Sequence, residues 1–266
     1  MNAHNVVIIT GKGGTGKTTI AVNMAVLWAQ EGFKVGLLDA DIHSPNIPRM
    51  LGIKSQGIEG LVDGIEPASP MAGLKVVSMA LFLHNQETPI TWRGPIKQGV
   101  IKQFISDSHW GDLDFLIVDL PAGTGDETLC AVHFLKKVAG ALIVSTPQAL
   151  SLLEVRRTNS FFRQLNVPII GLLENMSDFP CPHCEKTLIP FGSSGGEKVA
   201  KDMGIPFLGT LPINQEVAKC GDKGEPFITS IPQSMVAVRL REIAKRCKES
   251  MEKKVKFTLV TKLVYK

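Results

Sequence analysis

Apolar residues along the chain fall into short continuous runs that alternate with longer stretches of helical periodicity. The runs, rich in β-branched residues, span residues 6–10, 35–39, 74–78, 115–119, 141–146, 168–173 and 206–209. The helical stretches span residues 17–30, 96–105, 127–137, 150–165, 196–203 and 234–251. Continuous apolar strands that alternate with helices are typical of a parallel sheet covered on both faces. The pattern therefore predicts an α/β fold, with one doubly wound, mostly parallel sheet in a single domain over residues 1–250.

Residues 251–266 show a different pattern and form a basic C-terminal tail. Apolar side chains occupy one side of a two-residue alternation and lysines the other: Val255, Phe257, Leu259, Leu263 and Tyr265 against Lys256, Lys262 and Lys266. Such alternation predicts a half-buried edge strand, whose lysines would discourage pairing with other chains. A frayed terminus fits the same residues equally well.

The charge of the chain is concentrated in this tail. The whole chain has a net charge of +4, but residues 245–266 hold eight Lys/Arg and two Asp/Glu, so the remainder is net negative. The basic balance therefore gives no reason to expect a nucleic-acid partner. No apolar run approaches the ~18 residues of a membrane span, so we expect no membrane partner either. The first strand-like run begins at Val6, which leaves no room for a signal peptide and favours a cytoplasmic protein.

A glycine-rich segment between the first run and the first helical stretch fits the phosphate-binding motif G-x-x-x-x-G-K-[ST]. Its glycines allow backbone N–H groups to turn toward phosphate oxygens, and the following helix N-terminus adds its positive dipole. Lys17 would neutralise the β- and γ-phosphates, and the Thr18 hydroxyl would bind Mg²⁺. The motif predicts ATP as ligand and these nucleotide-binding residues: Gly11, Lys12, Gly13, Gly14, Thr15, Gly16, Lys17, Thr18 and Thr19.

Carboxylates follow two of the predicted strands. Asp39 and Asp41 end the second run, and Asp119 ends the fourth. Strand-end aspartates commonly cap helices. Beside a phosphate loop, however, they should converge on the ligand at the carboxyl edge of the sheet. Mg²⁺ takes one or two carboxylates besides phosphate oxygens, so Thr18, Asp41 and Asp119 are the candidate magnesium residues.

The second lysine of the loop, Lys12, makes the motif resemble the deviant P-loop of the SIMIBI class, which includes ParA, MinD and the nitrogenase iron protein. In that class this lysine reaches across a dimer interface to the partner's nucleotide, which implies a catalytic role for Lys12 beside Lys17. The same resemblance implies that Asp41 positions the attacking water and that Asp119 holds Mg²⁺ through water. We assign Asp39 a supporting role near the loop lysines. The segment PAGTGD at residues 121–126 resembles switch II, with Gly123 and Gly125 as its pivots.

Two of the five cysteines, Cys181 and Cys184, have C-x-x-C spacing. Two thiolates can bind one metal centre, but zinc sites and most iron–sulfur clusters have four protein ligands, so this pair alone does not complete a site. Cys130 and Cys247 lie in predicted helices, as core-filling thiols would, and Cys220 is expected in a polar loop. A two-fold dimer in which each chain donates two sulfurs would complete the site. Redox pairs and zinc knuckles share this spacing.

The motifs KGGTGKTT, DADIHSPNIP, TWRGPIK, DLPAGTGDE, ENMSDFPCPHC and LPINQEV together resemble the Mrp/ApbC-type iron–sulfur carrier ATPases in order and spacing. The resemblance covers nearly the whole chain. It implies a homodimer that binds and hydrolyses ATP, holds a labile [4Fe-4S] cluster between the Cys181 and Cys184 pairs of two chains, and transfers it to apo-proteins. Zn²⁺ can take the place of the cluster in isolated protein. Asn175 is expected to read the adenine edge, with Pro212 nearby.

Two other functions fit the sequence less well. A MinD/ParA-like positioning or partitioning ATPase would not need the cysteine pair. A reductase resembling the nitrogenase iron protein would need single cluster cysteines far apart in sequence; Cys130 lies near the expected place, but it has no partner there.

Overall fold

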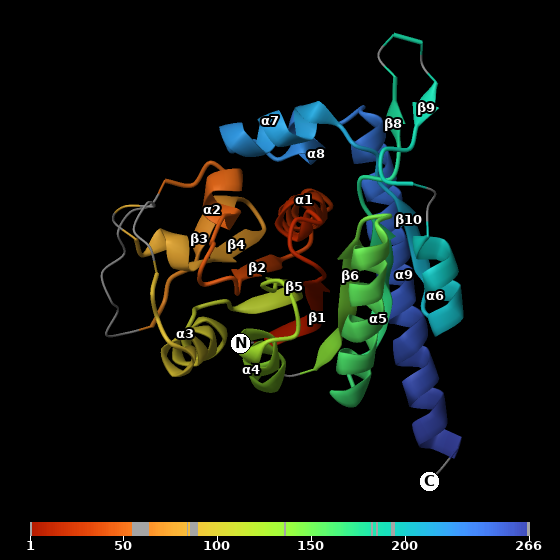
Figure 1. Cartoon of the computed structure of the whole chain (residues 1–266). Coiled ribbons are helices and arrows are strands. Elements are labelled where there is room, and N and C mark those ends of the chain that lie inside the picture. Colours follow the sequence, from red (N-terminus) through yellow and green to blue (C-terminus); the bar gives the residue numbers. More distant parts are fainter. Residues whose placement is uncertain are drawn as a thin grey trace.

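An eight-stranded sheet forms the centre of the molecule (Figure 1). The structure, a computed structural model, describes residues 2–54, 64–83, 85, 90–135, 137–181, 183–184, 186–192 and 195–264, with the backbone alone for residues 253–264. The strand order is β10-β7-β6-β1-β5-β2-β4-β3, and all pairs are parallel except β3 with β4. The strands are β1 Asn2–Thr10, β2 Val35–Asp39, β3 Ala68–Met71, β4 Leu74–Val77, β5 Asp112–Asp119, β6 Val138–Ser145, β7 Ile169–Glu174 and β10 Phe207–Thr210.

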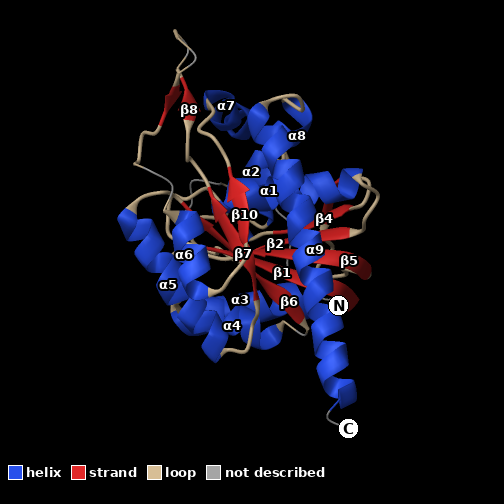
Figure 2. Cartoon of the chain, turned by 90° about the vertical axis from the view of Figure 1, so that its right-hand side faces the viewer, coloured by secondary structure: helices blue, strands red, loops and turns tan. Residues whose placement is uncertain are grey.

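Helices cover both faces of this sheet (Figure 2). One face packs against α1, α2, α7, α8 and α9, and the other against α3, α4, α5 and α6. The helices are α1 Lys17–Gln30, α2 Ile47–Met50, α3 Gly94–Ser106, α4 Asp126–Phe134, α5 Ala149–Gln164, α6 Gly196–Met203, α7 Gln215–Lys223, α8 Phe227–Ser230 and α9 Met235–Val264, with a 3₁₀ turn η1 at Met79–Leu81. The predicted doubly wound α/β fold is confirmed.

The central strands are apolar throughout because both of their faces are buried. In β1, Val7 and Ile9 join the core beneath α1, whereas Val6 and Ile8 join the core on the opposite face. All five residues of β2 are buried. Successive side chains of a strand point to opposite faces, so a sheet covered on both sides needs apolar residues at every position.

The strand order reverses at β1, which lies between β5 and β6. The chain leaves β1, forms α1 and returns to the sheet as β2 on one side of β1, whereas β6, β7 and β10 extend the sheet on the other side. At such a switch point the loops that follow neighbouring strands separate and leave a crevice at the carboxyl ends of the strands. The phosphate-loop motif, which follows β1, therefore lies at the mouth of this crevice.

The C-terminal tail differs from the prediction of an edge strand. Helix α9 continues through Val264, so the alternating residues 255–264 extend a helix that begins at Met235. A strand needs a neighbouring strand for its backbone hydrogen bonds, whereas a helix satisfies them within the segment and elongates readily once it has formed.

Several further elements were not predicted. They are β3, α2, α7, α8 and a small antiparallel hairpin of β8 Phe179–Pro180 and β9 Thr187–Leu188. The start of α7 could have been predicted from Asn214, a residue type that favours the N-cap position. Its side chain caps the helix by accepting from the N–H of Glu216 at 2.8 Å. None of the helices in the described part of the chain combines the length and the apolar character that crossing a bilayer requires.

Candidate functional site

The glycine-rich loop joins β1 to α1 and depends on backbone conformations that favour glycine. Gly11, Gly14 and Gly16 have φ values of 148°, 81° and 87°. A Cβ atom on Gly11 would lie 2.1 Å from the carbonyl oxygen of Val144, a backbone atom of β6 that cannot move aside. The Thr15 hydroxyl donates to the carbonyl oxygen of Lys12 at 2.9 Å and closes the loop. The loop is thus preformed, with Gly13 and Gly14 exposed, so that its backbone is accessible to a phosphate.

Lys17, in the first turn of α1, is a buried cation that contacts this loop. Its Nζ donates to the carbonyl oxygen of Lys12 at 3.2 Å, and its side chain is largely buried. Burial lowers the pKa of Lys17, and the charges of Asp119 and Asp41 act in the opposite direction. A buried ammonium with so few partners would be stabilised by the oxygens of a bound phosphate. Lys12 itself is half-buried in the loop.

Asp119, at the end of β5, places its carboxylate beside the Thr18 hydroxyl, where both could be ligands of Mg²⁺. The Thr18 hydroxyl donates to its Oδ2 at 2.6 Å, while Oδ1 is buried and has no hydrogen-bond partner among the described residues. Burial raises the pKa of Asp119 to about 7, although the Thr18 hydrogen bond and the Lys17 charge lower it. A buried carboxylate oxygen without a partner, beside a threonine hydroxyl, fits Mg²⁺ or one of its water ligands. The residues present therefore fit the predicted metal.

Asp39 supports the site through hydrogen bonds. Its Oδ2 accepts from the Ser78 hydroxyl at 2.8 Å, and its two oxygens accept from the backbone N–H groups of Asp41 and Ile47 at 3.2 and 3.4 Å. Burial, and next the charge of Asp119, raise the pKa of Asp39 well above its usual range. Its contacts are thus with Ser78, directly before η1, and with the segment of residues 41–47 that leads into α2. Asp39 thus holds the residue 41–47 segment in place, and a role near the loop lysines stays a prediction.

Asp41 lies on that segment and faces the phosphate loop. Its Oδ1 accepts from the N–H of Ser44 at 3.1 Å, and the half-buried side chain lines the same cleft as Lys17. Ala122 of the 121–126 segment also lines the cleft. Gly123 there has a φ of 88°, whereas Gly125 has a φ of −81° and forms the N-cap of α4. Only Gly123 therefore has the left-handed conformation that favours glycine.

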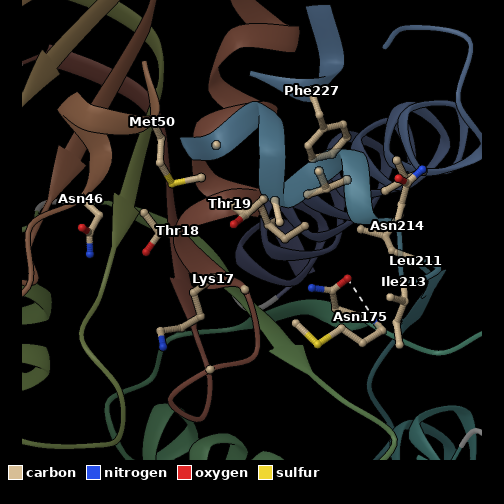
Figure 3. A pocket seen from close by; sticks show the side chains of 18 of the residues that line it. Lys17, Thr18, Thr19, Asn46, Met50, Asn175, Leu211, Ile213, Asn214 and Phe227 are labelled. Atoms are coloured by element: carbon tan, nitrogen blue, oxygen red, sulfur yellow. Dashed lines mark hydrogen bonds between the residues drawn. The ribbon is translucent and has the colours of Figure 1, made fainter. Parts of the chain in front are cut away.

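A cleft of about 980 Å³ extends from the phosphate loop toward α7 and α8 (Figure 3). Asn175 and Pro212, the two residues expected near the base, both line it. The amide of Asn175, directly after β7, donates to the carbonyl oxygen of Thr15 at 2.9 Å, so this side chain also fixes the loop. Apolar side chains line the end away from Lys17: Met50, Leu211, Ile213, Val217, Phe227 and Val236. The cleft thus joins a cationic end to an apolar end, as a nucleotide requires.

This apolar wall was not predicted from the sequence. Its residues come from α2, α7, α8, α9 and the segment after β10, elements that were either unpredicted or assigned only to the core. The motif LPINQEV at residues 211–217 could have indicated this wall, because its apolar residues Leu211, Ile213 and Val217 line the cleft.

The C-x-x-C motif lies on the β8–β9 hairpin, which projects beyond α7 and α8 (Figures 1 and 2). The N–H of Cys181 donates to the carbonyl oxygen of Lys186 at 2.9 Å across the hairpin. Cys181 is partly accessible and Cys184 is exposed. Hydrogen bonds from the backbone N–H groups of His183 and Cys184, and from the Cys184 thiol, lower the pKa of the Cys181 thiol. The hairpin therefore presents two thiols to solvent and favours the thiolate that a metal needs.

The described part of one chain does not complete a metal site around these thiols. No group of three or more His, Cys, Asp or Glu side chains is placed to hold a metal ion there. Cys130, Cys220 and Cys247 are all buried. Cys220 was expected in a polar loop, but it lies on the inner side of α7 and packs against the core.

The doubly wound sheet, the glycine loop with Lys17, and the strand-end carboxylates define a P-loop NTPase. Residues 2–248 match the family model described as ParA, NUBPL iron-transfer P-loop NTPase. The chain belongs to this family. It is 43% identical to the iron-sulfur cluster carrier protein of Methanocaldococcus jannaschii over 251 residues, which is 94% of this chain and 86% of the relative. It is 39% identical to the cytosolic Fe-S cluster assembly factor NUBP2 of Rattus norvegicus over 252 residues, 93% of each chain.

Solved structures agree with this assignment. A nucleotide-binding protein from Archaeoglobus fulgidus, in complex with ADP, superposes with a TM-score of 0.71 at 34% identity and covers 84% of this chain and 87% of its own. The cell division ATPase MinD of Pyrococcus furiosus superposes with a TM-score of 0.68 at 20% identity, over 92% of this chain and 98% of its own, and shows the common fold. The resemblance predicted from the sequence motifs is confirmed.

Proposed function

We propose that this protein is an ATP-binding and ATP-hydrolysing carrier that holds a [4Fe-4S] cluster between two copies of the chain and delivers it to apo-proteins. The observation that supports this most directly is the pairing of a nucleotide cleft with an exposed two-thiol hairpin. Five residues separate Asn175, which contacts the phosphate loop, from Cys181. The family and the names of its relatives agree with iron–sulfur cargo.

At the nucleotide end, each residue has a role that its position supports. The loop amides and Lys17 would bind the β- and γ-phosphates of ATP, and Thr18 and Asp119 would hold Mg²⁺, which neutralises charge on the phosphate oxygens. Asp41 would orient the attacking water, since it faces Lys17 across the cleft. Asn175 and Pro212 would bind the adenine.

At the thiol end, the number of ligands calls for two chains. A [4Fe-4S] cluster is held by four thiolates, and each hairpin offers only Cys181 and Cys184. Leu188 and Ile189, just after these thiols, are 47% and 54% exposed and would be covered in a two-fold dimer. In the same dimer, Lys12 of one chain would reach the nucleotide of the other and stabilise charge on the phosphoryl oxygens, as an arginine finger does.

We place the protein in the cytoplasm, since relatives from Rattus norvegicus and Dictyostelium discoideum are named cytosolic assembly factors. The alternative is a MinD-like positioning ATPase, which shares the fold. It would leave the exposed hairpin thiols without a role.

Anaerobic reconstitution followed by transfer tests the carrier function. Wild-type protein reconstituted with iron and sulfide should bind about four iron atoms per dimer and restore activity to an apo-aconitase-type acceptor. Cys181→Ser and Cys184→Ser should each lose the brown chromophore and the transfer but keep ATP binding, because the nucleotide cleft contains neither cysteine. Cys130→Ala is the matched control: it removes a buried thiol outside the hairpin and should transfer the cluster normally.

Iron at background level, or a cluster that forms equally well without both hairpin cysteines, would reject the carrier function in favour of the positioning ATPase. Zinc found in protein purified in air would not count against it, since zinc accepts the same four thiolates.

A further inference from the structure

A lysine outside the nucleotide cleft connects the two segments that flank it. Lys97 lies in the first turn of α3, and its Nζ contacts Nε2 of His43 at 2.9 Å and also forms an ion pair with Glu127. The side chains of Lys97 and Glu127 are only 13% and 19% exposed. The contacts join residues that are 54 and 30 positions apart in the sequence.

The hydrogen bonds around Lys97 have a defined direction. An ammonium can only donate, so Nε2 of His43 accepts, and Nδ1 carries the proton that it donates to the carbonyl oxygen of Ile90 at 3.1 Å. Burial raises the pKa of Glu127, but the hydrogen bond and charge of Lys97 outweigh burial and keep this pKa below its usual range. Glu127 is therefore an ionised partner of Lys97.

Both partners of Lys97 sit beside residues with a role at the phosphates. His43 follows Asp41 by two positions, on the segment that Asp39 holds in place. Glu127 belongs to the first turn of α4, directly after the 121–126 segment, and the neighbouring Thr128 donates to the carbonyl oxygen of Gly123 at 3.3 Å. Lys97 itself is not among the residues that line the cleft. A displacement of either segment therefore changes the hydrogen bonding of a cation shared with the other.

We propose that Lys97 is a positioning residue that couples the Asp41 segment to the 121–126 segment, so that the two adopt the hydrolysis-competent arrangement together. The proposal rests on the proposed ATPase function of the same cleft. An ion pair that only fastened α3 to α4 would need no contact with His43. Neither segment can move away from Lys97 without breaking a partly buried hydrogen bond. The conformation of one segment therefore affects which conformation of the other is stable.

The first test compares two lysines of α3. Lys97→Met should lower kcat for ATP by roughly 2- to 30-fold, the range expected for a residue that couples two segments. It should leave the Kd for ATP unchanged, because Lys97 does not touch the cleft. Lys97→Arg should keep most of the activity, since a guanidinium can donate to both partners. Lys102→Met is the control: Lys102 also packs on α4, 5.7 Å from the ring centre of Phe134, but it contacts neither segment.

The second test measures coupling directly, with His43→Ala and Glu127→Gln alone and together. In the wild-type background the two changes should be non-additive in kcat. With Lys97→Met they should have little further effect, because the bonds that they remove are already absent. Removal of Lys97 leaves Glu127 unpaired and can weaken the fold, so Lys97→Met/Glu127→Gln, which removes both charges, is measured beside the single variant.

Independent effects of His43→Ala and Glu127→Gln would overturn the coupling. So would a kcat unchanged by Lys97→Met, or an equal loss in Lys102→Met. Wild-type protein that binds no ATP, measured by calorimetry before any variant is compared, would instead reject the proposed function.

Discussion

Replacement of Asp119 by asparagine should change how the stability of the nucleotide-free protein depends on pH. Asp119 is 1% exposed, and burial raises its pKa from 3.8 to about 7. The native state therefore keeps this proton up to about pH 7, whereas the unfolded chain releases it near 3.8. Between these values the native state binds more protons than the unfolded state, so the free energy of unfolding falls as the pH rises.

The size of the effect follows from the two pKa values. Between about pH 5 and pH 8, ionisation of Asp119 should cost the wild-type protein about 3 kcal/mol of stability. Asparagine has nearly the same shape, can still accept from the Thr18 hydroxyl, and has no charge to bury. Asp39 acts in the same direction, because burial and next the charge of Asp119 raise its pKa; Asp119→Asn removes only the second of these causes. The Asp119→Asn variant should therefore lose much less stability over this range, while it loses magnesium-dependent ATP hydrolysis.

Urea unfolding without nucleotide, in the presence of a chelator, at several pH values from about 5 to 8 measures this difference through the denaturation midpoint. Asp112→Asn is the matched control, since Asp112 begins the same strand β5 but is exposed. It should retain the pH dependence of the wild type. Parallel pH profiles for the wild type and Asp119→Asn would show that Asp119 is already ionised in the folded protein, and the argument from burial would be wrong.

Two further predictions concern the lysines of the loop. Lys17→Ala should abolish nucleotide binding. It should also lose the thermal stabilisation by ATP, which for the wild type amounts to ~4 kcal/mol when ATP is present at ~1,000 times its Kd. Asp41→Ala should instead bind ATP but lose turnover. An unchanged ATP-induced melting shift in Lys17→Ala would contradict the loop assignment. Lys12→Ala should bind ATP and hydrolyse it slowly, and mixing it with Asp41→Ala should restore some activity, because one site of a mixed dimer carries both intact groups. If the mixture of the two variants is no more active than either variant alone, Lys12 does not act on the nucleotide of the partner chain. It then acts in the site of its own chain or is a surface residue.

Features that depend on neighbouring residues could be predicted from the sequence. The phosphate loop is a contiguous motif, and its helix begins at Lys17 as predicted. Asp119 follows a continuous apolar run, and the strand-end rule brought it to the loop, where it accepts from Thr18 although 101 positions separate them. Only Cys181 and Cys184 are closely spaced, which predicted that one chain would supply two of the four ligands of a metal centre.

Features that depend on contacts between distant residues were decided by the tertiary structure. Asp39 has its partner in Ser78, 39 positions away, and nothing in the local pattern distinguished this contact from one with the loop lysines. The alternation in residues 255–265 fitted an edge strand or a frayed terminus equally well, but a strand forms only beside another strand, whereas α9 could extend without one. Lys97, His43 and Glu127 lie in three separate motifs, and only the packing of α3 against α4 and the Asp41 segment brings them together. Sequence patterns report the periodicity and chemistry of single segments, while the choice of partners across the core depends on how those segments pack.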